Sequence, residues 1–92
     1  MNKAELVEAV VGMTGDTKRK TEDFIDAFTK TVMEAVAKGD KVSIVGFGNF
    51  ERRHRGERKG RNPRTGDPIT IEAKDYPAFT PGKGFRDIIA GK

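Results

Sequence analysis

Apolar residues near the N-terminus recur at three- and four-residue intervals, a spacing that places them on one face of a helix. Asn2 is suited to cap this helix, and Gly12 and Gly15 are expected to end it. A tight turn then leads to a second helix. The apolar residues of the first helix are Leu6, Val7, Val10 and Val11.

The second predicted helix is longer, with Asp16 or Thr17 as its cap and an end near Ala37, before Lys38 and Gly39. Its apolar residues form a stripe at four-residue intervals, which needs a partner surface to cover it. That stripe consists of Phe24, Phe28, Val32 and Val36, widened by Ile25, Met33 and Ala35.

After residue 40 the apolar period changes from helical to extended. Val42 and Ile44 alternate with polar residues, and Gly46 and Gly48 interrupt the extended chain on either side of Phe47. We assign the phenylalanines to core packing. The alternative, base stacking on a sheet surface, needs exposed aromatic rings among basic residues, and this sequence keeps the two apart.

Residues 51–59 contain no apolar side chain, so a strand there cannot cover a core on either face and is expected to project into solvent. Residues 60–67 are rich in turn formers, and the return segment 68–74 alternates Ile69 and Ile71 with polar residues. The pattern predicts a hairpin arm over about residues 52–74. Because an isolated two-stranded ribbon is marginally stable in water, its tip is expected to be disordered until something binds it.

The last segment predicts a return to the core and a short final helix. Tyr76, Pro77 and Phe79 are expected in the core, with Thr80 as the cap and Pro81 as the first residue of the helix. The apolar side of that helix would consist of Phe85, Ile88 and Ile89.

Length and composition favour one domain that depends on a partner. The chain has 92 residues, of which 35% are hydrophobic and 35% charged, so it buries only a modest fraction of its surface. A partner subunit would relieve that shortage. We therefore expect a single α+β domain over residues 1–92, with a helical region (1–40), a β region (41–80) and a C-terminal helix (81–92).

Several classes of protein are disfavoured by what the sequence lacks. It has no cysteine, which excludes disulfides and thiolate metal sites and fits a reducing cytoplasm. No apolar run approaches the roughly 20 residues that cross a bilayer, and the N-terminus lacks the features of a secretory signal. His54 is the only histidine, without a nucleophile or metal-ligand motif around it. We expect a soluble, intracellular protein that is not an enzyme and uses no cofactor, metal or small-molecule substrate.

Positive charge is concentrated in one segment. Residues 1–40 carry six Lys/Arg against eight Asp/Glu, a net −2, whereas residues 52–64 carry seven against Glu57 alone, a net +6. Such segregation is typical of nucleic-acid binders, although it would also attract membrane surfaces and acidic proteins. A charged edge strand that resists aggregation is the ordinary alternative, but this needs only one or two charges. The cations are Arg52, Arg53, Arg55, Arg58, Lys59, Arg61 and Arg64.

An extended ribbon rises about 3.3 Å per residue, so its cations would meet successive phosphates along a groove. Asn62 and Pro63 at its tip are ordinary turn residues by themselves. At the end of a basic ribbon, however, the rigid ring of Pro63 is suited to wedge between base pairs and kink the duplex. Lys3, Lys83 and Arg86 are candidates either for solvated surface charge or for phosphate contacts beside the bend.

The glycine–phenylalanine segment 46–50, the arm arginines and the tip segment 60–66 together resemble the signature of the bacterial HU and integration host factor family. The match is specific and extends over the chain, through the spacing of segments 2–3, 39–40, 77–79 and 81–83. Gly56 in an arm strand and Gly84 in the last helix depart from the pattern, which puts arm stiffness and the stability of that helix in question.

The resemblance implies an intertwined dimer with a helical base, a β-saddle and two arms that embrace DNA in the minor groove. Pro63 would intercalate, and Asn62 beside it at the tip would also bind DNA. The dimer core would include Phe28, Val32, Phe47, Phe50 and Phe79. The DNA contacts would come from Arg53, Arg55, Arg58, Lys59, Arg61 and Arg64 on the arm, and from Lys3, Lys83 and Arg86 on the body.

The sequence thus predicts an architectural protein of the cytoplasmic nucleoid that bends and compacts double-stranded DNA with little sequence specificity. Its preferred partners would be bent, nicked or gapped duplexes and a second, identical chain, with a paralogue as the alternative subunit. Three other functions stay open. They are a sequence-specific bender like integration host factor, a scaffold whose basic arms engage acidic proteins, and an enzyme acting on nucleic acid.

Overall fold

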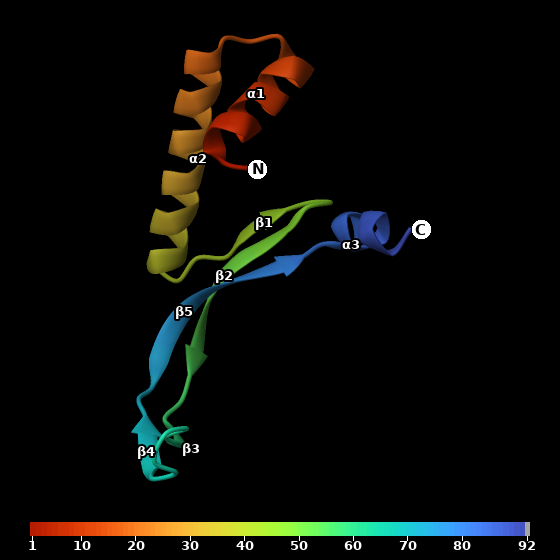
Figure 1. The fold of residues 1–92 in the computed structure, drawn as a ribbon. Coiled ribbons are helices and arrows are strands. Elements are labelled where there is room, and N and C mark those ends of the chain that lie inside the picture. Colours follow the sequence, from red (N-terminus) through yellow and green to blue (C-terminus); the bar gives the residue numbers. More distant parts are fainter. Residues whose placement is uncertain (92) are drawn as a thin grey trace. The chain divides into compact units, whose positions relative to one another are not determined.

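The computed structural model describes residues 1–91, and the chain divides into two units, Met1–Glu34 and Ala35–Lys92. The first unit contains α1 (Lys3–Thr14) and most of α2 (Lys18–Ala37). The second contains the end of α2, the strands and α3, and is drawn from yellow-green to blue in Figure 1.

Both ends of α1 are capped. Asn2 Oδ1 accepts a hydrogen bond from the Glu5 amide at 2.9 Å, and Glu5 Oε1 accepts one from the Asn2 amide at 3.4 Å. This reciprocal pair is a capping box. Gly15, with φ +74°, ends the helix in the left-handed conformation as predicted. The prediction that Gly12 ends the helix was wrong, because a single glycine inside a helix costs only about 1 kcal/mol and the helix continues through it.

Helix α2 keeps its predicted bounds within a residue. The Thr17 hydroxyl accepts a hydrogen bond from the Lys20 amide at 3.1 Å, as a cap does, and Gly39 follows the helix with φ +95°. The apolar stripe of the helix is poorly covered within one chain: Phe24 is 68% exposed and Phe28 39%.

The second unit contains two antiparallel sheets. One has the order β1–β2–β5, from β1 (Val42–Ile44), β2 (Gly48–Arg55) and β5 (Lys74–Pro81). The other pairs β3 (Arg58–Arg61) with β4 (Pro68–Ile71). Figure 1 shows the two long strands running from the three-stranded sheet toward the short β3–β4 hairpin.

The predicted arm is present, but its strand pairing is interrupted along its length, at a segment that we call the joint. The β2–β5 ladder ends where Arg55 lies opposite Lys74, and the β3–β4 ladder begins where Arg58 lies opposite Ile71. Residues 56–57 and 72–73 between the ladders belong to neither strand pair. Gly56, expected inside an arm strand, therefore lies in this joint.

The last helix, α3 (Lys83–Ala90), begins later than predicted. Thr80 and Pro81 belong to β5, where they lie opposite Asn49 and Gly48, and Gly82 is the N-cap. The Gly82 amide donates to the Phe47 carbonyl at 2.8 Å. Pairing with β2 therefore keeps the chain extended through Pro81, a long-range effect that a local cap signal cannot show.

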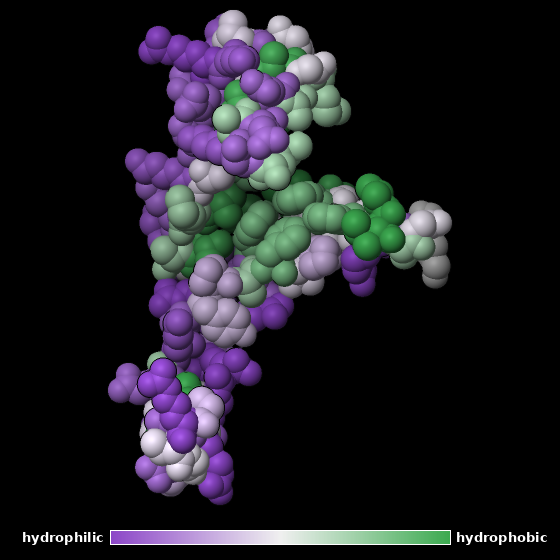
Figure 2. Space-filling view, viewed as in Figure 1, coloured by the Kyte–Doolittle hydropathy of each residue, from purple (hydrophilic) through white to green (hydrophobic). Residues whose placement is uncertain are grey.

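Four phenylalanines form the apolar centre of this unit. Among the rings of Phe47, Phe50, Phe79 and Phe85, five of the six pairs have centroids between 4.9 and 6.3 Å apart. The cluster is open, since Phe47 is 41% exposed and Phe79 39%. Figure 2 shows the apolar side chains gathered over the three-stranded sheet and α3, while the arm is mostly hydrophilic. Within the described residues no large side chain is fully buried, so one chain alone does not close a core.

Candidate nucleic-acid interface

The tip of the arm is a hydrogen-bonded turn built around Asn62. The Asn62 amide donates to the Asp67 carbonyl at 2.9 Å, and the Asn62 carbonyl accepts from the Gly66 amide at 2.7 Å. Its side-chain Oδ1 accepts from the Arg64 amide at 2.9 Å. These bonds hold the chain on both sides of Pro63, so the proline ring stands at the corner of a defined loop. The disorder expected at the unbound tip stays a prediction.

Strand alternation gives the root of the arm two different faces. Arg52 and His54 lie on one face of β2, and Arg53 and Arg55 lie on the other. Directly opposed residues of an antiparallel pair share a face, so the register adds Asp75 to the first face and Tyr76 and Lys74 to the second.

The first face carries its own counter-ion. Asp75 Oδ2 accepts hydrogen bonds from Arg52 Nε at 3.0 Å and Nη2 at 2.7 Å, and Asp75 Oδ1 lies 2.6 Å from His54 Nδ1. We call these three residues the arm-root clasp. The His54 hydrogen bond, and after it the Arg52 guanidinium, holds the pKa of the Asp75 carboxyl below its ordinary value of 3.8.

Arg53, on the second face, is also paired. Its guanidinium donates to Glu51 Oε1 at 3.0 and 2.8 Å and to the Thr80 hydroxyl at 2.9 Å. The hydrogen bond to Glu51 raises the pKa of Arg53, so it stays charged. The structure therefore places Arg53 on the arm, where a DNA contact was predicted, but with the Glu51 carboxylate beside it. A phosphate that takes this arginine must share it with Glu51.

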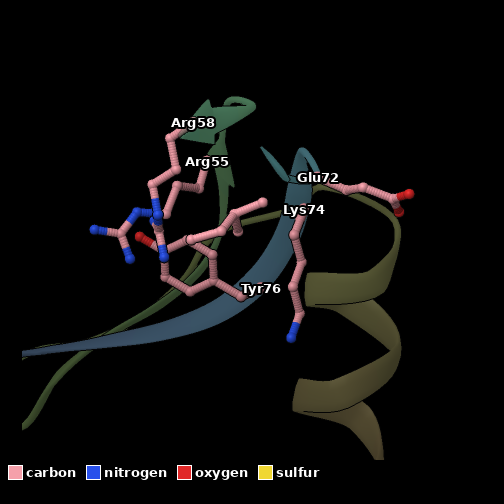
Figure 3. A pocket seen from close by; sticks show the side chains of 6 residues that line it. Arg55, Arg58, Glu72, Lys74 and Tyr76 are labelled. Atoms are coloured by element: carbon pink, nitrogen blue, oxygen red, sulfur yellow. The ribbon is translucent and has the colours of Figure 1, made fainter. Parts of the chain in front are cut away.

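At the joint, three cations surround a hollow of about 380 Å³. Arg55, Arg58 and Lys74 line it together with Tyr76, and Figure 3 shows both arginines on the side of the tyrosine ring while Glu72 extends away from them. In residues 1–91 none of the three cations has a carboxylate oxygen within 4 Å. Three cations outnumber Glu72 among the residues that line the hollow, so its potential is expected to be positive, and an anion would relieve it.

Beyond the joint, one face of the ribbon carries Ile69 and Ile71, with Arg58 directly opposite Ile71. Gly60 lies against Ile71, whose Cδ1 would be 3.1 Å from a Cβ at position 60. Lys59 and Arg61 alternate with Gly60, so they project from the opposite face. Arg61 Nη1 donates to the Gly66 carbonyl at 3.1 Å and steadies the turn. Along the described chain, neither of these cations nor Arg64 forms an ion pair.

The predicted body cations occupy two different places. Lys83 and Arg86 lie one turn apart on α3, and both are exposed. Lys3 belongs to the helical unit, where it pairs with Asp26 at 2.5 Å and with Glu22 at 3.9 Å. The hydrogen bond to Asp26 raises the pKa of the Lys3 amino group. A phosphate would have to compete with both carboxylates for Lys3.

Some of these features escaped the sequence prediction. Tyr76 was expected in the core and instead lines the hollow, and Lys74 was not singled out although it lies beside Arg55. The pairing of Arg52 and His54 with Asp75 spans more than 20 residues. Only the β2–β5 register brings these groups together, and no local sequence pattern predicts that register.

Residues 1–91 contain no group of three or more His, Cys, Asp or Glu side chains placed to hold a metal ion. None of their helices combines the length and the apolar character needed to span a bilayer.

Comparisons with known proteins agree on one family. The family model described as bacterial DNA-binding protein matches residues 1–90. DNA-binding protein HU 1 of Bacillus subtilis is 47% identical over the full length of both chains. DNA-binding protein HU of Geobacillus stearothermophilus is 48% identical over 97% of this chain and 99% of its own.

Solved structures give the same result. The chain in the cocrystal of Anabaena HU with DNA superposes with a TM-score of 0.92 at 47% identity, and the match covers all of both chains. HU from Thermotoga maritima superposes with a TM-score of 0.68 at 32% identity, over 97% of this chain and 98% of its own.

Proposed function

We propose that this chain, which belongs to the HU family of bacterial DNA-binding proteins, acts as a homodimer whose two arms enter the minor groove of duplex DNA and bend it. As a member of that family, it is a non-enzymatic, histone-like architectural protein that binds DNA with little sequence specificity. Its place would be on the nucleoid, in the cytoplasm.

The unpaired arm cations are the observation that carries the proposed mode of binding. Arg55, Arg58, Lys59, Arg61 and Arg64 form no ion pair within the described chain, on a ribbon that has almost no core of its own. Phosphate oxygens would neutralise them and release counter-ions from the duplex, so affinity comes without base readout. Arg53 would add to these contacts by sharing its guanidinium between Glu51 and a phosphate.

The proposed dimer rests on the open apolar surfaces. The stripe that includes Phe28 and the half-buried Val32 is incompletely covered, and Phe47 and Phe79 are each about two-fifths exposed, with Phe50 beside them. Monomeric proteins rarely expose so many large apolar groups on one small chain. A second copy would bury them, since a dimer interface of this kind resembles a core divided in half.

Pro63 is the proposed wedge. It stands at the corner of a turn that Asn62 holds with backbone and side-chain hydrogen bonds. A rigid ring presented this way could separate adjacent base pairs, at a cost of about a few kcal/mol per step. Nicked, gapped or already bent duplexes have met some of that cost, so they should bind best. Lys83, Arg86 and, after release from Asp26, Lys3 would then hold the flanking DNA.

Fluorescence-detected bending of a linear and a nicked duplex tests this function. Pro63→Ala should reduce bending of the linear duplex and affect the nicked one less, because the nick weakens the stacking that the wedge has to break. Pro68→Ala is the matched control, since Pro68 is an exposed proline of the same ribbon placed away from the corner. Equal bending by the Pro63 and Pro68 variants on both duplexes would refute the wedge. Failure of the wild-type protein to bend either duplex would refute the proposed function.

A further inference from the structure

The arm-root clasp joins three elements of the second unit. Besides the two bonds to Asp75, the Arg52 guanidinium donates from Nη1 to the Ala37 carbonyl at 2.7 Å. Ala37 is the last residue of α2, and the final carbonyls of a helix lack partners within the helix. Arg52 therefore connects β2 to β5 through Asp75 and to the end of α2 through Ala37.

The position of the clasp matters because the ribbon beyond it has little to hold it. Past Arg55 the strand ladder is interrupted, and the β3–β4 hairpin has only Ile69 and Ile71 as apolar support. A two-stranded ribbon of this kind does not keep a direction by itself. The clasp is located just before the joint, where a small change of angle is multiplied along the length of the arm.

We propose that Asp75 is a positioning residue for DNA bending, which acts through Arg52 to fix the direction in which the arm leaves the three-stranded sheet beside Ala37. This inference rests on the proposed function, because it assumes that the arms bend the duplex. Asp75 itself need not touch DNA. Its carboxylate would orient Arg52. Without this contact the base of the arm would be mobile, so the arms would change direction on binding and the duplex would bend less.

A purely electrostatic role for Asp75 makes the opposite prediction. As a carboxylate on a cationic arm, it would only weaken attraction to phosphates, and its removal would strengthen binding without altering the bend. Glu72 supplies the matched control. It lies on the same return segment, three residues away, and forms no ion pair among residues 1–91, so Glu72→Gln changes the arm charge by the same amount as Asp75→Asn.

The experiment compares wild type, Asp75→Asn and Glu72→Gln in bending of a linear duplex and in amide hydrogen exchange of the free protein. For Asp75→Asn we expect exchange about twofold to fivefold faster in residues 52–55 and 74–77, the size expected for a partly exposed ion pair, together with a smaller bend. Glu72→Gln should leave both unchanged while it tightens binding. Asp75→Glu, which keeps the carboxylate, should recover most of the bend.

Arg52→Lys provides a second test that keeps the charge of the arm constant. It loses the forked contact with Asp75, so it should reduce the bend as Asp75→Asn does, and the double variant should be no worse than either single one. Asp75→Asn and Glu72→Gln with the same bend and the same exchange would overturn the inference and leave the proposed function intact. If Asp75→Asn does not fold, a wild-type bend for Arg52→Lys overturns it instead.

Discussion

Gly84 lies against the carbonyl oxygen of Gly46, so closely that a Cβ at position 84 would come within 2.9 Å of that atom. The first turn of α3 thus packs on the turn between β1 and β2 through bare backbone. Glycine at this position looks unfavourable for a helix, yet its lack of a side chain is what allows the contact.

Gly84→Ala should therefore destabilise the protein, although alanine is the better helix former. Neither backbone segment has a flexible side chain that could move aside, so we expect a loss of about 1–3 kcal/mol, as for other overpacked sites. Gly12→Ala is the matched control: it also lies in a helix, and a Cβ there would meet nothing within 4 Å. It should raise stability by about 0.5–1 kcal/mol. Thermal unfolding of both variants would decide, and equal effects would contradict the packing argument.

Asp75 should make stability depend on pH in the acid range. Because the folded state holds the pKa of this carboxyl below 3.8, the charged form is favoured in the folded protein. Its contribution is complete above the unfolded pKa and is lost as the pH falls through the folded pKa. The stability difference between wild type and Asp75→Asn should thus be present at about pH 5 and shrink below about pH 3.8 in urea titrations. A difference that grows on acidification would exclude this account.

The salt dependence of DNA binding should distinguish paired from unpaired arginines. Arg55→Gln removes a cation without a described carboxylate partner, so the slope of log affinity against log salt should fall by about 0.9 for each phosphate that the variant no longer neutralises. Arg53→Gln should lower it less, because Glu51 already neutralises Arg53 in the free protein. Identical slope changes would show that the Arg53–Glu51 pair opens completely on DNA.

The exposed apolar stripe predicts that folding depends on protein concentration. The thermal midpoint of wild type should rise with concentration, since dimerisation stabilises only the folded chain. Phe28→Glu places a charge in the proposed interface and should abolish the dimer in sedimentation experiments. Met13→Glu is the control, because Met13 is 90% exposed and lies outside the stripe. A purified chain that stays monomeric and stable would argue for a different partner, such as a paralogue.

Local sequence patterns were sufficient for most elements of this fold. The capping box at Asn2, the end of α1 at Gly15 and the bounds of α2 follow from contacts within a few residues. The arm could be predicted for a related reason: residues 51–59 have nothing apolar to bury, so no core could hold them. The start of α3 could not, because β2 holds Thr80 and Pro81 in a strand.

The sequence by itself determined where the positive charge lies along the chain. It also determined that the ribbon carrying this charge must project into solvent. Tertiary structure alone decided which of those cations are available. Side chains alternate between the faces of a strand, so a shift of one residue in the β2–β5 register would exchange the two faces. The observed register pairs Asp75 with Arg52 and His54 and brings Lys74 beside Arg55. These residues are too far apart in the sequence for any local pattern to predict that they are neighbours.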